Sequence, residues 1–93
     1  MILKWHRRAR QDLGKIRAYI GRDNPQAAAR VAQRIVEAAG QLAKHPGIGR
    51  PGRVIDTREL IVTGTPYLMP YAVAGEEIVI LRVLHGSQQW PAP

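Results

Sequence analysis

The chain has 93 residues, of which 45% are hydrophobic, so it has room for one small core and not for a second. It contains no cysteine, which excludes disulfides, thiolate zinc sites and a cysteine nucleophile. Lys and Arg number 14 against 7 Asp and Glu, giving a net charge of +7. A surface of this sign attracts polyanions such as nucleic acid or an acidic protein. We therefore expect one domain, residues 1–93, with an anionic or nucleic-acid-bound partner.

The sequence carries no signal for a membrane or a metal. No stretch approaches the ~20 apolar residues of a membrane span. The first ten residues, MILKWHRRAR, lack the apolar core of a secretion signal. The three histidines have no ligand-like spacing. We expect a cytoplasmic protein that makes no membrane contact and uses neither a metal nor a cofactor.

The first half of the chain predicts a short strand and two helices. Residues 1–5 indicate the strand, with Trp5 in the core. Helical spacing of apolar residues then predicts a helix over residues 6–21. A second helix starts with Asp23 or Asn24 as its cap and Pro25 in the first turn, and ends at Pro46-Gly47. The short connection predicts an antiparallel helical hairpin. The two apolar stripes are Ala9, Leu13, Ile16 and Ile20, and Ala28, Val31, Ile35, Ala38 and Leu42.

A flexible basic connector, GIGRPGR, follows the second helix, and after it the apolar period changes to two. Strands are predicted over residues 57–63, 66–74 and 77–85, joined by short hairpin loops. The fold class is α+β with the order β-α-α-β-β-β: an antiparallel sheet with the N-terminal helical hairpin packed on one face. Because proline removes a ladder donor, Pro70 predicts an edge position or a bulge.

Five short motifs occur in order over nearly the full chain, from Trp5 to Pro91. They are NP at the start of the second helix, PGIGR in the connector, TREL, PY and VLHG in the strands. With these motifs the chain resembles the RelE/ParE superfamily of bacterial type II toxins, and it is most similar to the ParE-type toxins. The fold that the resemblance implies is the one predicted above.

The resemblance implies two different activities. RelE-like toxins are ribosome-dependent mRNA endonucleases that use basic residues on the sheet together with a tyrosine or histidine near the C-terminus. ParE-like toxins inhibit DNA gyrase and have no recognised catalytic residues. Both are neutralised by an antitoxin encoded beside them, for ParE usually of the ParD type, in a toxin–antitoxin hetero-oligomer.

The candidate catalytic set for an mRNA endonuclease is small. Cleavage without a metal needs a base, an acid and cations for the phosphate. The chain offers Arg58, Arg82 and His85, with Tyr71 as a distant fourth. The arginine that follows the aromatic residue of the third strand in RelE-like toxins is replaced by Leu68. The spacing therefore favours a ParE-type gyrase inhibitor without catalytic residues.

Several of these residues also have structural interpretations. Arg82 interrupts an apolar strand and requires a carboxylate or carbonyl partner if it is half-buried; we expect Glu59 across the sheet. His85 ends its strand and is expected to bond the backbone, with general-base chemistry as the alternative. Tyr67 and Tyr71 share one strand face, where they either pack in the sheet or stack on bases.

We expect two interaction surfaces. The polar C-terminal end, Gln88, Gln89 and Trp90, is the predicted target-binding segment, because glutamines hydrogen-bond readily and tryptophan is a strong interface anchor; packing of Trp90 over the sheet edge is an equal alternative. Basic residues beside an apolar groove of the helical hairpin predict antitoxin binding: Arg10, Arg17, Arg22 and Arg34. The favoured function is a gyrase-inhibiting toxin. The alternatives are an mRNA endonuclease and a degenerate toxin that only binds its antitoxin and represses the operon.

Overall fold

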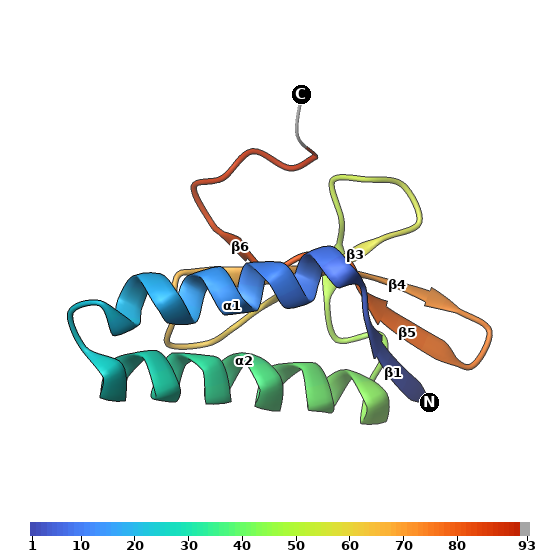
Figure 1. The fold of residues 1–93 in the computed structure, drawn as a ribbon. Helices are drawn as coiled ribbons and strands as arrows, with labels where there is room; N and C mark the ends of the chain where they lie inside the picture. Colours follow the sequence, from blue (N-terminus) through green and yellow to red (C-terminus); the bar gives the residue numbers. More distant parts are fainter. Residues whose placement is uncertain (92–93) are drawn as a thin grey trace.

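The protein is described by a computed structural model over residues 1–91, which form two helices and a mixed sheet. Figure 1 shows the helices side by side on one face of the sheet. The elements are β1 (Ile2–Trp5), α1 (Arg7–Gly21), α2 (Pro25–Lys44), β2 (Arg50–Pro51), β3 (Arg58–Ile61), β4 (Tyr67–Ala74), β5 (Glu77–Ile80) and β6 (Leu84–His85). The α+β fold and the helical hairpin are confirmed.

Local sequence signals set the starts of both helices. The His6 Nδ1 atom accepts a hydrogen bond from the Arg8 amide, 3.0 Å away, and Asn24 Oδ1 accepts one from the Ala27 amide at 3.0 Å. Both side chains therefore satisfy amides that have no partner within their helix. Pro25 occupies the first turn of α2, as predicted.

The strands pair in the order β1-β5-β4-β3-β2, and β6 also pairs with β4. The antiparallel meander of β3, β4 and β5 is confirmed. The prediction of a wholly antiparallel sheet is wrong at one edge, because β1 pairs with β5 in parallel. This register brings Leu3 opposite Ile78 and Trp5 opposite Ile80, so the apolar face continues across the edge. Alternation predicts which face is apolar but not the strand direction.

A bulge divides the predicted strand 77–85 into β5 and β6. Two residues of β4 face three residues of the neighbouring strand there, and Arg82 is the middle one. The Leu81 amide donates to the Pro70 carbonyl at 2.8 Å. The predicted bulge at Pro70 is confirmed, while the edge alternative is wrong because β4 pairs on both sides. The flanking registers are Tyr71↔Ile80 and Leu68↔Leu84.

The connector after α2 is more ordered than its composition predicts. Its residues Arg50 and Pro51 form β2 and pair with Glu59 and Arg58 of β3. The buried Tyr71 hydroxyl donates to the Pro46 carbonyl at 2.8 Å and accepts from the Gly49 amide at 2.9 Å. The expectation of a flexible connector is therefore wrong for these residues, because a buried side chain from β4 bonds their backbone.

The core lies between the helical hairpin and the sheet. Tyr71 is fully buried in it, and Trp5 and Tyr67 are half-buried against it. The predictions that Trp5 belongs to the core and that both tyrosines pack within the sheet are confirmed. The other large side chains of this buried cluster are Ile35, Leu42, Val62, Met69, Ile78, Ile80 and Val83.

Candidate functional site

Arg82 is held by a carboxylate from the first helix. Its Nε and NH2 groups donate to Asp12 Oδ2 and Oδ1 at 2.7 and 3.0 Å, and the Val83 amide donates to Oδ2 at 2.9 Å. The two side chains are only 15% and 13% exposed. The hydrogen bonds that Arg82 donates to Asp12 raise the pKa of Arg82 above its ordinary value. The bulge thus turns Arg82 toward α1, where it joins two distant parts of the chain.

The predicted partner of Arg82 was wrong. Glu59 is buried, at 2% exposure, and bonds the connector instead: Oε1 lies 3.3 Å from Arg50 NH2 and 3.4 Å from Arg53 Nε, and Oε2 accepts from the Arg53 amide at 2.8 Å. The requirement for a carboxylate or carbonyl partner is met by the carboxylate of Asp12, because Glu59 is already bonded to Arg50 and Arg53. The sequence signal for the true partner was Asp12 itself, the only acid in the first predicted helix.

Arg58 also bonds the connector. Its NH1 group donates to the Gly49 carbonyl at 2.8 Å and to the Gly47 carbonyl at 3.4 Å. Together with Tyr71 it fixes the chain between α2 and β2. These contacts give Arg58 a structural role in the isolated protein.

His85 ends β6 and bonds its own turn. Its Nδ1 atom lies 3.1 Å from the Ser87 amide and 2.8 Å from the Ser87 hydroxyl oxygen, and the His85 amide donates to Gln88 Oε1 at 2.7 Å. Its ring meets Tyr67 edge-on, with centroids 5.8 Å apart. The expectation that His85 bonds the backbone is confirmed.

The structure does not bring the three candidate catalytic residues together. Arg58 pairs with Tyr71, and His85 pairs with Tyr67. These two tyrosines are four residues apart on β4, which corresponds to about 13 Å along the strand. Arg82 lies between them but its guanidinium is bound to α1. Base, acid and phosphate-binding cations therefore do not converge on one point.

The predicted target-binding segment has an exposed and a packed part. Gln88 and Gln89 are exposed, whereas Trp90 is half-buried. The Trp90 ring centroid lies 6.0 Å from the Arg82 guanidinium carbon, a distance at which a cation attracts an aromatic face. Its Nε1 atom is buried without a hydrogen-bond partner within residues 1–91. The Gln88 side chain accepts a hydrogen bond from the His85 amide. Gln89 and the exposed side of Trp90 are therefore the parts of this segment that can contact a partner.

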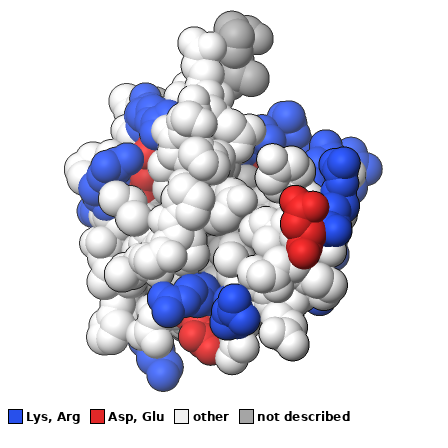
Figure 2. All heavy atoms as spheres, turned by 90° about the vertical axis from the view of Figure 1, so that its left-hand side faces the viewer, with Lys and Arg blue, Asp and Glu red and all other residues white. Residues whose placement is uncertain are grey.

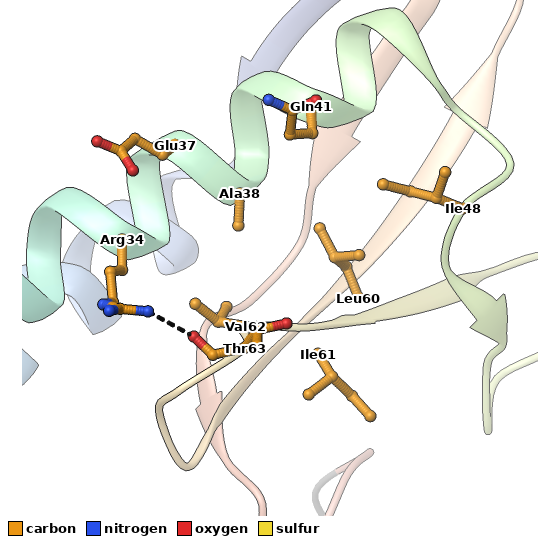
Figure 3. Close-up of a pocket in the computed structure, with 9 residues that line it drawn as sticks. All are labelled: Arg34, Glu37, Ala38, Gln41, Ile48, Leu60, Ile61, Val62 and Thr63. Atoms are coloured by element: carbon orange, nitrogen blue, oxygen red, sulfur yellow. Dashed lines mark hydrogen bonds between the residues drawn. The ribbon is translucent and has the colours of Figure 1, made fainter.

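An apolar hollow of about 340 Å³ lies between α2 and β3. In Figure 3, Ala38, Ile48, Leu60 and Val62 point into this space, while Glu37 points outward. Arg34 stands at its rim and donates to the Thr63 carbonyl at 3.2 Å. Beside it, Leu60 and Ile61 have no strand partner on their outer edge within residues 1–91, because β2 pairs only with Arg58 and Glu59. Ile48 and Ile61 are 49% and 54% exposed.

The four predicted antitoxin-binding arginines lie at three different places. Arg10 and Arg17 line an open hollow of about 420 Å³ between the two helices, with Leu13 and Val36. Arg34 lies at the α2–β3 hollow. Arg22 caps the C-terminus of α1 and lines neither hollow. On the face shown in Figure 2, basic side chains form separate groups around an uncharged centre, each with an acidic side chain nearby.

Neither a membrane-spanning helix nor a metal-holding cluster is present within residues 1–91. No helix there is long and apolar enough to cross a membrane. No cluster of three or more His, Cys, Asp or Glu side chains there is arranged to hold a metal ion.

Comparison with known proteins identifies the class. Residues 3–90 match the family described as "ParE toxin of type II toxin-antitoxin system, parDE". The chain is 47% identical to the Sinorhizobium fredii protein Y4kP over 96% of this chain and 92% of that protein. It is 42% identical to toxin RelE2 of Caulobacter vibrioides, over 90% of this chain and 93% of that toxin.

A solved structure has the same fold. It is described as the chromosomal ParDE TA system from P. aeruginosa, with a TM-score of 0.84 and 36% identity over 91% of this chain and 95% of that one. Fold and relatives together define a toxin of the RelE/ParE type. The chain belongs to the ParE toxin family of type II toxin–antitoxin systems.

Proposed function

We propose that this toxin inhibits DNA gyrase and is neutralised by a ParD-like antitoxin. The observation that supports gyrase over the ribosome is the state of the three candidate catalytic residues. Arg82 is bonded to Asp12, Arg58 to the connector carbonyls, and His85 to its own turn. A metal-free endonuclease needs such groups free and converging on one phosphate. The match to the family described as ParE toxins agrees with this proposal.

A ribosome-dependent mRNA endonuclease is the second candidate. Two relatives from Caulobacter vibrioides, at 42% and 36% identity, carry the names toxin RelE2 and toxin RelE3. In this alternative His85 acts as the base or acid, and Arg58 and Arg82 bind the phosphate after binding to the ribosome rearranges their contacts.

Loss of the C-terminal end should weaken gyrase inhibition. We expect deletion of residues 87–93, of which 92–93 lie outside the described part, to raise the concentration needed for half-inhibition of supercoiling at least tenfold, or about 1.4 kcal/mol. The reason is that Gln89 and Trp90 offer a polar group and an aromatic anchor at an exposed position. Stability should fall by no more than about 2 kcal/mol, because the deletion removes one cation–π contact to Arg82 and the exposed hydrogen bonds of Ser87 and Gln88 to His85.

The matched control removes residues 91–93 only and keeps Trp90. This variant should inhibit gyrase like the full chain. If instead the full chain leaves supercoiling unaffected and cuts mRNA on ribosomes, with cutting abolished by His85→Ala, the endonuclease replaces the gyrase inhibitor.

For the antitoxin we propose that an amphipathic segment covers the α2–β3 hollow. The hollow is apolar inside, Arg34 stands at its rim, and the open edge of β3 offers unpaired backbone groups to an added strand. An acidic segment with alternating apolar residues fits all three features.

A charge placed in this hollow should block the antitoxin. We expect Ile48→Asp to weaken binding of the ParD-type antitoxin encoded beside the toxin at least tenfold, measured by calorimetric titration. Ile48 is 49% exposed and points into the hollow (Figure 3), so a desolvated carboxylate there would face an apolar or acidic segment. Ile55→Asp is the matched control, since Ile55 is 85% exposed and lies in the loop between β2 and β3. Equal weakening by both variants would mean that the antitoxin does not bind in the α2–β3 hollow.

A further inference from the structure

The unpaired positive charge of the protein is concentrated on α1. Within residues 1–91, four of the 14 bases and three of the 7 acids are in ion pairs, which leaves ten bases and four acids. Six of the ten unpaired bases lie between residues 7 and 22, and no unpaired acid lies there, because Asp12 is bonded to Arg82. The six are Arg7, Arg8, Arg10, Lys15, Arg17 and Arg22.

Four of these bases form a ridge along the outer side of the helix. Arg8, Lys15 and Arg22 follow one another at intervals of seven residues, which is close to two helical turns and about 10.5 Å per step. They therefore lie nearly in line over about 21 Å, with Arg7 beside Arg8. All four side chains are exposed. We name Arg7, Arg8, Lys15 and Arg22 the basic ridge.

The ridge lies on a different side of α1 from the hollow between the helices. That hollow is lined by Arg10 and Arg17 with Leu13 and Val36, and at 100° per residue these two arginines are more than a quarter turn from the line of Lys15. By the same rotation of 100° per residue, the ridge shares its side of α1 with Gln11, Asp12, Ala18 and Tyr19. Asp12 is bonded to Arg82, and Tyr19 is 71% exposed. Protein interfaces rely on apolar and aromatic anchors, and this side of the helix supplies one exposed aromatic ring, Tyr19.

We propose that the basic ridge binds the phosphate backbone of double-stranded DNA. Phosphate binding requires only charge and N–H donors, which guanidinium groups supply in pairs. The line of about 21 Å matches roughly six base pairs at 3.4 Å each. A helix also fits the major groove of B-DNA, about 12 Å wide, and does not fit the narrow major groove of A-form RNA. The inference stands apart from the proposed gyrase inhibition, because it concerns DNA alone.

The test is fluorescence anisotropy of a labelled 20-base-pair mixed-sequence DNA duplex titrated with the purified chain, without gyrase or antitoxin. The ridge variant combines Arg7→Gln, Arg8→Gln, Lys15→Gln and Arg22→Gln. The matched control removes the same charge from other exposed sites: Arg10→Gln, Arg17→Gln, Arg30→Gln and Lys44→Gln. An RNA duplex of the same length is the second probe.

The ridge variant should bind DNA at least tenfold more weakly than the control variant at 50 mM salt. Each lost phosphate contact lowers the dependence of log K on log salt by about 0.9, so the slope should fall by about 3.6. If the ridge variant melts at a lower temperature than the control, the single changes Arg8→Gln and Lys15→Gln should still lower the slope by about 0.9 each. Equal losses in ridge and control variants, tighter binding of the RNA duplex, or no DNA binding by the unaltered chain would overturn the proposal.

Discussion

Replacing Tyr71 with alanine is expected to destabilise the protein by about 3–5 kcal/mol, the usual cost of removing a buried aromatic side chain. Tyr71 is fully buried in the core and its hydroxyl bonds Pro46 and Gly49. For a domain of this size 1 kcal/mol corresponds to about 4–8 °C in Tm, so the loss should exceed about 12 °C. Thermal unfolding followed by circular dichroism measures it.

Tyr71→Phe separates the ring from the hydroxyl. The ring still fills the core, but the Gly49 amide and the Pro46 carbonyl lose their partner, which should cost about 1–3 kcal/mol. Gly49→Ala tests the same contact from the other side, because an added Cβ would lie 2.6 Å from Tyr71 Cε1 and its hydroxyl oxygen. A Tyr71→Phe protein as stable as the unaltered chain would mean that the hydroxyl does not hold the connector.

The parts of the fold that local chemistry decides were predictable from the sequence. Pro25 predicted the first turn of α2, with Asn24 as one of two candidate caps. The missing amide of Pro70 predicted an edge position or a bulge, and the bulge is observed. What failed were features set by contacts between distant residues. The direction of β1 depends on its pairing with β5, more than 70 residues later. The order of the connector depends on one tyrosine hydroxyl on β4.

The candidate site shows the same division. A half-buried Arg82 required a carboxylate or carbonyl partner, and the structure supplies the carboxylate of Asp12. Choosing between Glu59 and Asp12 required the tertiary fold, because the bulge alone decides which way Arg82 turns. Arg22 could have been separated from Arg10 and Arg17 by helical geometry at 100° per residue. The apolar hollow between α2 and β3 could not be predicted from the sequence. It depends on how these two elements pack together, whereas the apolar pattern describes each element by itself.

Replacing Asp12 with alanine is expected to cost about 2–4 kcal/mol, measured by urea unfolding. The change removes three hydrogen bonds at once and leaves the Arg82 guanidinium and the Val83 amide half-buried without an acceptor. Arg82→Ala should cost less, about 1–3 kcal/mol, because Asp12 then still accepts from Val83. A larger loss of stability for Asp12→Ala than for Arg82→Ala would show that Asp12 accepts from both the Arg82 side chain and the Val83 backbone. A simple ion pair would give similar losses for the two variants.

The double variant identifies the partner of Arg82. Asp12→Ala combined with Arg82→Ala should cost less than the sum of the single changes by about 1–3 kcal/mol, whereas Glu59→Gln combined with Arg82→Ala should be additive.

The raised pKa of Arg82 gives the expected pH dependence of this coupling. A base whose pKa is higher in the folded state stabilises the protein below its unfolded pKa and loses that contribution only as pH rises through the folded value. For Arg82 this window lies far above physiological pH, so its titration leaves the coupling unchanged between pH 6 and pH 10. Additivity between Asp12 and Arg82 would contradict the bond between α1 and the bulge.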